Sequence, residues 1–324
     1  MSASAVPVYF DCDTGIDDSL ALAYLLRSPE AEIVGIGTVS GNTDSATAAR
    51  NTLDLLALAG RTDVPVAIGA HDFLAEAYAG GSPYVHGDNG FGNVDIPDSP
   101  VAPVTGDAAE LLRALAQAHP GELRVIAVGP LTNLAIALER YPELPGLVHD
   151  VTIMGGTAMA PGNVTPVAEA NIWHDPEAAA AVFEADWDLT MVGLDVTMTQ
   201  RMHESHRDAL LAASDPLAVA IGHALDYYFE FYISHFGERT AALHDPLAAA
   251  VALGTGGLRL APRVPVAVDA TRGPGRGQTI ADLRTRHVGF AGAPASRTAV
   301  ALEVADGFAD ALVARILSDS APAS

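Results

Sequence analysis

Apolar and polar positions alternate along this chain in blocks that predict strands and helices in turn. Short, almost wholly apolar runs between turn residues are typical of buried strands, and longer Ala- and Leu-rich runs are typical of helices. We therefore expect strands over residues 6–10, 32–39, 64–68, 123–128, 150–154 and 188–194, and helices over 17–27, 43–59, 107–118, 129–140, 176–184, 201–212, 216–236, 306–317 and from about 244. Residues 263–304 have strand character with Gly-rich turns.

Regular alternation of strands and helices predicts an α/β fold: an open, mostly parallel, doubly wound (Rossmann-like) sheet with helices on both faces. No stretch has the composition of a linker, so we expect a single domain over residues 1–324, with a frayed tail at 318–324. Residues 69–105 are irregular and rich in Gly, Pro, His, Asn and Asp. Such a long irregular segment inside a compact domain usually has a functional task, such as covering a site.

Composition narrows the classes of partner. Hydrophobic residues make up 49% of the 324 positions, which is ample for a full core, and the net charge is −23. An acidic chain repels phosphates and anionic lipids, so we expect neither nucleic acid nor membrane as a partner. The sequence has no Lys, and its 17 basic residues are all Arg, which excludes phosphate sites and Schiff bases that depend on Lys.

Sequence features also bear on location. The single cysteine, Cys12, permits no intrachain disulfide, and we interpret it as a small buried apolar residue. Residues 1–7 lack the basic and apolar regions of a signal peptide, and no apolar stretch has the length of a membrane span. We therefore expect a cytoplasmic protein.

Four aspartates crowd the turn between the first predicted strand and helix: Asp11, Asp13, Asp17 and Asp18. Carboxylates this close cannot all stay ionised and buried without a cation, and oxygen ligands suit Ca²⁺ or Mg²⁺. The carboxyl end of a strand is also where open α/β sheets bind ligands. The alternative is that Asp13 caps the helix and that Asp17 and Asp18 complement its dipole.

The segment Asp11-Cys-Asp-Thr-Gly-Ile-Asp-Asp18 resembles the N-terminal signature of the nucleoside hydrolases, the inosine–uridine-preferring N-ribohydrolase family. Five further segments fit in the same order, between about residues 6 and 255: Gly41-Asn42, Gly129-Pro-Leu-Thr-Asn133, Met154-Gly-Gly156, Gly162-Asn-Val-Thr-Pro166 with Glu169-Ala-Asn171, and His244-Asp-Pro-Leu247. The resemblance implies hydrolysis of the N-glycosidic bond of ribonucleosides to free base and ribose by a water that Ca²⁺ activates. It further implies a homodimer or homotetramer and a role in purine or pyrimidine salvage.

The resemblance also implies roles for individual residues. The metal ligands would be Asp13, Asp18, Asp245 and the backbone carbonyl of Val128, with Asp13 also acting as general base on the water. His244 is the second catalytic candidate, since an imidazole can activate the departing base. Substrate contacts would come from Asp17, Asn42, His86, Met154, Asn163, Glu169, Asn171 and Tyr232. A ribosyl cation-like transition state is stabilised by nearby negative charge, which such a site supplies.

Structural alternatives stand beside these roles. Asp-Pro recurs at 175–176 and 215–216, so Asp245 could simply be a helix N-cap, and His244 could be a structural residue at a helix start. The Asn side chains could satisfy loop backbone. Tyr228 and Tyr232, four apart, have the spacing of a core-facing stripe as well as that of a base-stacking pair.

Two other functions remain open on the residues alone. The run Phe10-Asp-Cys-Asp13 resembles the nucleophile motif of haloacid-dehalogenase-type Mg²⁺-dependent phosphatases. Gly15 departs from that motif, which has Thr or Val there, and the chain lacks the Lys that those enzymes generally place on the phosphate. A non-catalytic nucleoside- or ribose-binding protein would use the Asn and Asp side chains but would not need four clustered carboxylates.

Overall fold

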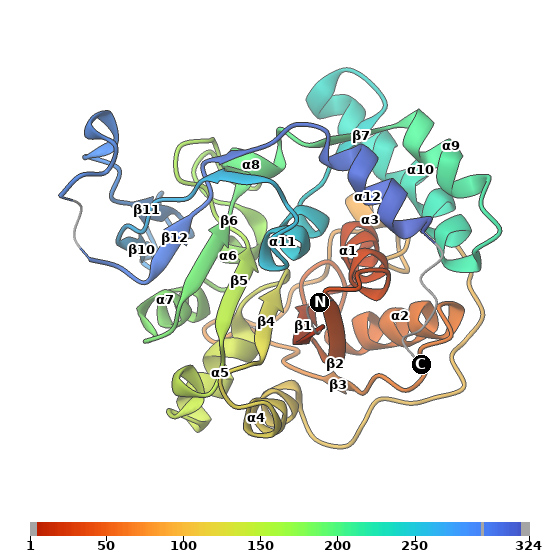
Figure 1. Cartoon of the computed structure of the whole chain (residues 1–324), viewed down its shortest axis with the longest axis horizontal. Helices are drawn as coiled ribbons and strands as arrows, with labels where there is room; N and C mark the ends of the chain where they lie inside the picture. The colour runs from red at the N-terminus through yellow and green to blue at the C-terminus, as the bar shows by residue number, and fades with distance from the viewer. Residues whose placement is uncertain (1–4, 293–294, 319–324) are drawn as a thin grey trace.

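A sheet of parallel strands forms the centre of the computed structural model, which describes residues 5–292 and 295–318 (Figure 1). Its seven strands lie in the order β12-β6-β5-β4-β1-β2-β3, and every neighbouring pair is parallel. The strands are β1 (Val6–Cys12), β2 (Ala31–Thr38), β3 (Val66–Ile68), β4 (Arg124–Ala127), β5 (Asp150–Met154), β6 (Leu189–Val192) and β12 (Thr298–Val300). The predicted open, mostly parallel α/β sheet is thereby confirmed.

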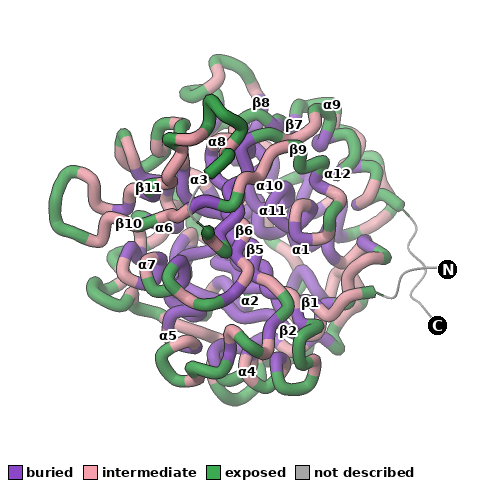
Figure 2. The backbone as a smooth tube through the Cα atoms, turned by 60° about the vertical axis from the view of Figure 1, so that its left-hand side comes forward, coloured by how far each residue is buried: buried purple, intermediate pink, exposed green. Residues whose placement is uncertain are grey.

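Helices cover both faces of this sheet, and each face has its own apolar core. One core includes residues of α1 (Ile16–Leu26), α2 (Ser45–Leu58), α10 (Pro216–Phe236), α11 (Asp245–Ala252) and α12 (Phe308–Ile316). The other includes residues of α4 (Ala108–Ala118), α5 (Thr132–Arg140) and α7 (Pro176–Glu184). Strand β1 contributes Val8 and Phe10 to the first core and Tyr9 to the second, since side chains alternate along a strand. Figure 2 shows the buried interior and the exposed outer loops.

Shorter elements fill the connections. These are the helices α3 (Pro83–His86), α6 (Ala170–His174), α8 (Leu194–Thr197), α9 (Glu204–Leu211), η1 (Leu144–Gly146) and η2 (Arg286–Val288). Three small antiparallel pairs join β7 (Arg201–His203) to β8 (Thr240–Ala242), β9 (Leu258–Leu260) to β13 (Glu303–Val304), and β10 (Val266–Val268) to β11 (Thr279–Ala281). Residues 69–105 are irregular as expected, apart from α3.

Some predicted boundaries were wrong. Residues 201–203 form strand β7, not the start of a helix, because they pair with β8 far along the chain. Helix α6 lies where we expected a loop, and the Glu169 side chain caps it. The segment after Val192 bends into α8, so β6 is shorter than predicted. Apart from Ser318, the expected frayed tail lies outside the described residues.

The strand order places the site. From β1, the chain builds β2 and β3 on one side and β4, β5 and β6 on the other, so the winding direction switches between β1 and β4. In open α/β sheets ligands bind outside the carboxyl ends of the strands at such a switch point. Asp13 directly follows β1, and Val128 directly follows β4.

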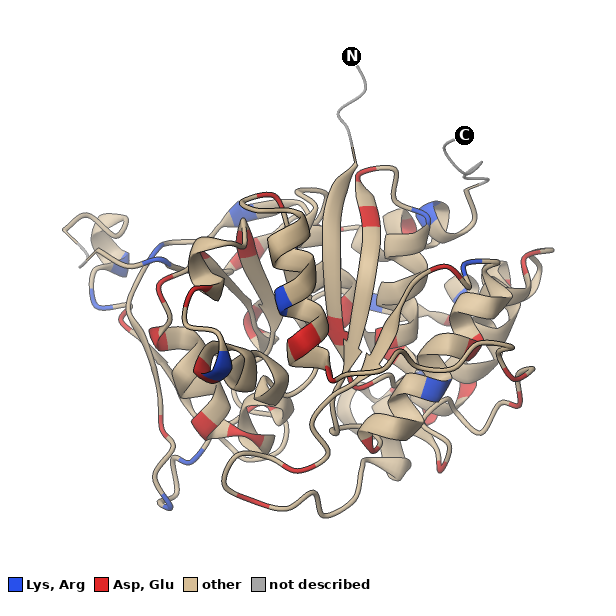
Figure 3. Ribbon diagram, turned by 90° about the horizontal axis from the view of Figure 1, so that it is seen from below, with Lys and Arg blue, Asp and Glu red and all other residues tan. Residues whose placement is uncertain are grey.

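Acidic residues outnumber basic ones, and Figure 3 shows Asp and Glu positions on strands, helices and loops, with fewer Arg positions among them. Among the residues that the structure describes, no helix combines the length and apolar character needed to cross a membrane.

Candidate active site

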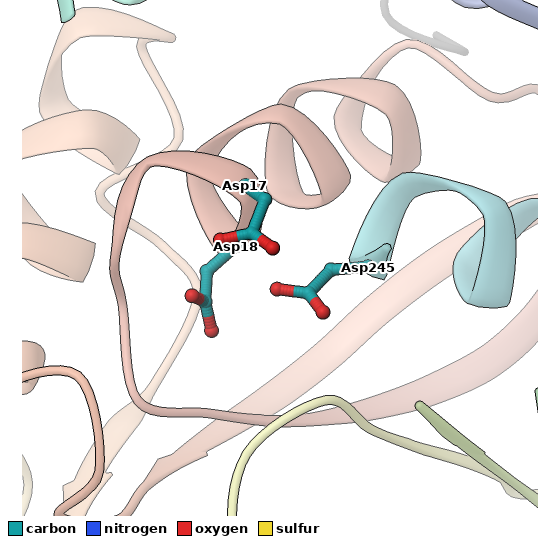
Figure 4. Close-up of side chains that lie close together, drawn as sticks. All are labelled: Asp17, Asp18 and Asp245. Atoms are coloured by element: carbon teal, nitrogen blue, oxygen red, sulfur yellow. The ribbon is translucent and has the colours of Figure 1, made fainter. Parts of the chain in front are cut away.

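Three buried carboxylates, those of Asp17, Asp18 and Asp245, converge beyond the carboxyl ends of the central strands (Figure 4). One oxygen from each lies within 4.8 Å of the others. Asp17 and Asp18 stand in the first turn of α1, and Asp245 is the first residue of α11, which packs against α1. The packing of these two helices therefore brings distant parts of the sequence to one point.

Asp13 and Asp18 belong to the same acidic network. Asp18 Oδ1 accepts a hydrogen bond from the Asp13 backbone N–H at 3.1 Å, and Asp18 Oδ2 accepts one from the Gly15 N–H at 2.8 Å. Asp13 Oδ2 accepts from the Asn42 N–H at 2.6 Å. Within the described residues, Asp13 Oδ1 and Asp17 Oδ1 are buried and have no hydrogen-bond partner.

The structure separates two interpretations of these aspartates. Gly15, not Asp13, occupies the N-cap position of α1, so the capping role considered for Asp13 is wrong. Asp175 and Asp215 are N-caps whose side chains accept from helix N–H groups, whereas Asp245 lies inside its helix, after His244. The Asp245 carboxylate instead joins the acidic cluster.

Burial raises the pKa of every carboxylate in this cluster, and repulsion between charges adds to this for Asp13, Asp17 and Asp245. Desolvation is the largest cause in each case, and the charge of Asp18 is the next cause for Asp13 and for Asp17. The pKa of Asp17 rises to about 7. Repulsion by Asp17, Asp18 and Asp13 adds to the effect of burial on Asp245. A bound cation would reduce the repulsion between these carboxylates and would give the oxygens that lack a hydrogen-bond partner a positive charge to interact with.

The donor set fits a hard metal ion. All side-chain donors are carboxylate oxygens, which is the set that Ca²⁺ and Mg²⁺ prefer. The Val128 carbonyl accepts a hydrogen bond from Asn171 Nδ2 at 2.7 Å, and both residues line the adjacent cavity. The three carboxylates that lie within 4.8 Å of one another are those of Asp17, Asp18 and Asp245. The resemblance instead implies Asp13, and not Asp17, as a metal ligand.

A cavity of about 590 Å³ opens over this cluster. Eleven residues singled out from the sequence line it: Asp17, Asn42, His86, Val128, Met154, Asn163, Glu169, Asn171, Tyr232, His244 and Asp245. Asp13 and Asp18 are buried and do not line it. Its volume lies within the range of small-molecule sites.

Hydrogen bonds to the backbone fix the side chains expected to hold a sugar. Glu169 Oε1 accepts from the Asn171 N–H and Oε2 from the Gly156 N–H, both at 2.9 Å. Asn163 Oδ1 accepts from the Ala170 N–H at 3.0 Å. Because their rotamers are set by these bonds, little side-chain entropy remains to be lost on binding.

His244 sits in a short hydrogen-bonded chain. Its Nε2 lies 2.7 Å from the Tyr232 hydroxyl and its Nδ1 lies 2.8 Å from Thr197 Oγ1. Burial lowers the pKa of His244 to about 4, so the ring is neutral near pH 7. Sequence reasoning missed Thr197, because no local pattern marks the short helix α8 that carries it.

His86 brings the irregular segment to the cluster. Its Nδ1 accepts a hydrogen bond from the Ile16 N–H at 3.1 Å and lies 4.0 Å from Asp17 Oδ1. Burial, and then the charge of His244, lowers the pKa of His86 to about 3. Since Nδ1 is an acceptor, the proton of this neutral ring lies on Nε2.

Tyr228 and Tyr232 of α10 are buried, and both line the cavity. The rings of Tyr228 and Tyr232 are T-shaped with centroids 5.0 Å apart, and Tyr232 stacks on Phe236 at 5.3 Å. His86 packs against Tyr228 at 5.6 Å. Each of these two side chains therefore belongs to the core and also lines the cavity, so both interpretations of this stripe apply.

Close packing explains two glycines of the sequence motifs. A Cβ added at Gly41 would lie 2.1 Å from Asp13 Oδ2, and one added at Gly15 would lie 2.6 Å from His86 Nδ1. Neither position has room for a side chain. These glycines let the backbone approach the acidic cluster.

Several cavity residues have no counterpart in the sequence predictions, among them Phe73, Trp173 and Arg276. They come from the irregular segment, from α6 and from the turn between β10 and β11. Only the folded arrangement brings these three segments together, so no sequence pattern could have found them.

Known proteins similar to this chain share its function class. A family described as "Inosine-uridine preferring nucleoside hydrolase" matches residues 8–309. The probable uridine nucleosidase 2 of Arabidopsis thaliana is 39% identical over 240 residues, covering 74% of each chain. The pyrimidine-specific ribonucleoside hydrolase RihA of Citrobacter koseri is 38% identical over 248 residues, covering 76% of this chain and 78% of the relative.

Solved structures agree with these relatives. The purine-preferring ribonucleoside hydrolase from Gardnerella vaginalis superposes with a TM-score of 0.88 at 32% identity, covering 96% of this chain and 98% of the other. A plant nucleoside hydrolase, PpNRh1, superposes with a TM-score of 0.89 at 30% identity, covering 97% and 99%. These matches favour neither the phosphatase nor the non-catalytic alternative. The chain belongs to the inosine-uridine preferring nucleoside hydrolase family, whose members hydrolyse the N-glycosidic bond of ribonucleosides.

Proposed function

We propose that this protein is a calcium-dependent ribonucleoside hydrolase whose ion is held by Asp13, Asp18, Asp245 and the Val128 carbonyl. The supporting observation is the buried acidic cluster, in which Asp13 Oδ1 has no hydrogen-bond partner. Ca²⁺ takes six to eight oxygen ligands in flexible geometry, which suits a mixed carboxylate and carbonyl set. When bound, such an ion gathers a water and lowers its pKa.

The ribose would be held with its hydroxyls on the acidic side of the cavity. Asp17, Asn42, Asn163, Glu169 and Asn171 offer carboxylate and amide groups, which match hydroxyls that both donate and accept. Met154 supplies an apolar contact beside Asn171, whose Nδ2 donates to the Met154 carbonyl at 3.1 Å. The negative charge around the sugar stabilises the positive charge that develops on it as the N-glycosidic bond breaks.

Proton transfer would involve residues on opposite sides of the sugar. Asp13 acts as general base, since its free Oδ1 can accept the proton that the water loses. On the other side, Tyr232 and His244, which share a hydrogen bond, would lie close to the departing base. Because His244 is neutral near pH 7, this pair supplies a neutral donor to the base rather than an imidazolium ion.

Uridine is the first substrate to test. Several relatives at 36–39% identity are named uridine nucleosidases or pyrimidine-specific hydrolases, whereas the Gardnerella vaginalis enzyme is named purine-preferring. We propose that uridine is hydrolysed and that inosine is the purine to compare with it. A cytoplasmic homodimer or homotetramer that serves purine or pyrimidine salvage also belongs to this proposal. Its support is the family resemblance.

Release of base from uridine and inosine, before and after dialysis against a calcium chelator, tests the proposal. We expect the chelated enzyme to lose activity and to regain it with added Ca²⁺. Asp13→Asn should lower kcat by about 10²-fold or more, as loss of a general base does. Asp44→Asn is the matched control, since Asp44 only caps α2, and it should retain wild-type kcat. Full activity in the chelated protein would exclude the metal-dependent mechanism.

A further inference from the structure

One aspartate outside the acidic cluster holds the loop between β5 and α6 by its backbone. The carboxylate of Asp195, in α8, accepts hydrogen bonds from three consecutive N–H groups of this loop. Oδ2 accepts from Ala158 at 2.7 Å, and Oδ1 accepts from Met159 at 2.8 Å and from Ala160 at 3.0 Å. Such bonds are stronger when the acceptor is charged. A single side chain therefore restrains residues 158–160.

These residues depend on that restraint, because little apolar burial secures the loop. Met159 is 45% exposed and Val164 is 42% exposed. Just before residues 158–160, the Thr157 N–H donates to Thr279 Oγ1 at 2.8 Å, which fixes where the loop begins. Segments with few buried apolar contacts open easily. We therefore expect the carboxylate of Asp195 to limit the motion of the loop.

The loop carries a residue that lines the cavity, Asn163. Its Oδ1 accepts from the Ala170 N–H at 3.0 Å, so the Nδ2 group is the part of this amide that can donate to a ligand. The Asn163 N–H donates to the Ala168 carbonyl at 3.2 Å, which anchors the residue on the side of α6. Asn163 follows Ala160 by three positions, so Asp195 supplies the anchor on the other side.

Helix α8 also contacts a second part of the site. Thr197 Oγ1, two residues after Asp195, lies 2.8 Å from His244 Nδ1. Two residues correspond to about 200° around a helix, so the two side chains leave α8 on opposite sides. The Leu194 N–H donates to the Gly156 carbonyl at 3.0 Å, which holds the start of α8 against the start of the loop. Asp195 and Thr197 thus contact different parts of the site.

We propose that Asp195 is a positioning residue for the hydrolase reaction, and that it acts by holding residues 158–160 so that Asn163 faces the cavity. The inference rests on the proposed function, in which Asn163 contacts the substrate. Asp195 does not line the cavity and is not one of the three clustered carboxylates, so it takes no direct part in breaking the bond. Its effect falls on substrate affinity and passes through Asn163.

Steady-state kinetics on uridine with the calcium-loaded protein test this inference. Asp195→Ala should raise KM by about tenfold, the worth of one hydrogen bond to the substrate, and should leave kcat within about threefold of wild type. Asp107→Ala is the matched control, because the Asp107 carboxylate also accepts a backbone N–H, at the start of α4, and does not line the cavity. It should leave both constants unchanged.

A double-mutant cycle separates positioning from an independent effect. Asn163→Ala should raise KM by about as much as Asp195→Ala does. If Asp195 acts through Asn163, the double variant should show the same rise of about tenfold, not the product of two independent losses, which is about a hundredfold. Hydrogen exchange gives a second measure. In Asp195→Ala the amides of residues 158–160 should exchange about tenfold or more faster, while those of α4 should not change.

The other outcomes would overturn the inference. Faster exchange with an unchanged KM would leave Asp195 with a structural task alone, and a fall in kcat without a rise in KM would contradict its role in affinity. A double variant with the full product of the two rises would show that Asn163 is not its route. If Asp195→Ala does not fold, Asp195→Asn removes the charge and one acceptor oxygen and should raise KM by about threefold. Wild type that releases base from no ribonucleoside would defeat the proposed function, and this inference with it.

Discussion

Two pairs of buried aspartates in this molecule differ in whether all their carboxylate oxygens have hydrogen-bond partners. Asp11 and Asp175 are each 0% exposed, and their oxygens are satisfied by hydrogen-bond donors. Asp13 and Asp17 are also buried, yet each keeps an oxygen with no partner among the described residues. Burial alone therefore does not separate these two pairs, whereas unmet hydrogen-bonding capacity does.

The satisfied aspartates have local structural tasks. Asp11 accepts from the Tyr9 hydroxyl at 2.8 Å and from Asn133 Nδ2, and so links β1 to the start of α5. Asp175 accepts from Thr132 Oγ1 at 2.7 Å and from the N–H groups of Leu74 and Ala178. Substitutions in each group should therefore affect different properties.

The largest expected effect is on activity, in the acidic cluster to which Asp13 and Asp17 belong. Asp245→Asn removes one charge from the cluster and should lower kcat/KM for uridine by about 10³-fold, as loss of a preorganised electrostatic contact does. The same change relieves repulsion, so the chelated variant should melt no lower than the chelated wild type. A large fall in melting temperature with chelator present would place Asp245 among the structural acids.

Substitution in the satisfied group should affect stability instead. Asp175→Ala leaves three donors without their acceptor and should lower the free energy of unfolding by about 3 kcal/mol. Urea titration measures this loss. The fraction that remains folded should keep a kcat within a few-fold of wild type, and a kcat loss as large as that of Asp245→Asn would remove the distinction between the two groups.

Calcium itself should separate the groups by a smaller effect. An ion that binds only the folded state stabilises it by about 2.7 kcal/mol at a hundredfold excess over its Kd. In thermal melting, added Ca²⁺ should raise the melting temperature of the wild type and of Asp175→Asn. It should not raise the melting temperature of Asp245→Asn. An equal rise in both variants would mean that the ion binds elsewhere.

The smallest expected effect extends the comparison to a histidine. Both ring nitrogens of His244 have partners, and Thr197→Val removes the one at Nδ1 with little change in shape. We expect kcat to fall by up to about tenfold, the worth of one such hydrogen bond, with KM nearly unchanged. Steady-state kinetics on uridine measure both constants. A rise in KM alone would assign Thr197 to substrate binding instead of ring orientation.

The sequence was most informative where one element decides its own conformation. The apolar runs of β1 and β5 and the Asp-Pro start of α7 and α10 need no distant partner to be recognised. Residues 201–203 were misassigned because their conformation depends on pairing with β8. Helix α6 was missed because its N-cap is Glu169, a residue type that gives no usual start signal.

The same limit applies to the site. Asp13, Asp17 and Asp18 are local in sequence and were predicted to cluster from their spacing, whereas Asp245 was implied only by the family resemblance. The Thr197 contact with His244 and the aromatic pair of Phe73 with His174 depend on the packing of separate segments. Which oxygen lacks a partner is likewise a property of the fold and is invisible in a string of residues.

The meeting of α1 with α11 has a consequence for biosynthesis. The acids at the amino end of the chain are translated early, but Asp245 follows only after all the strands from β1 to β8. Under the ligand set that we propose, a nascent chain that lacks α11 would hold an incomplete set of ligands for the ion. The proposed metal site could therefore form only after six of the seven strands of the central sheet have been translated, so that metal capture would follow the formation of long-range contacts between α1 and α11.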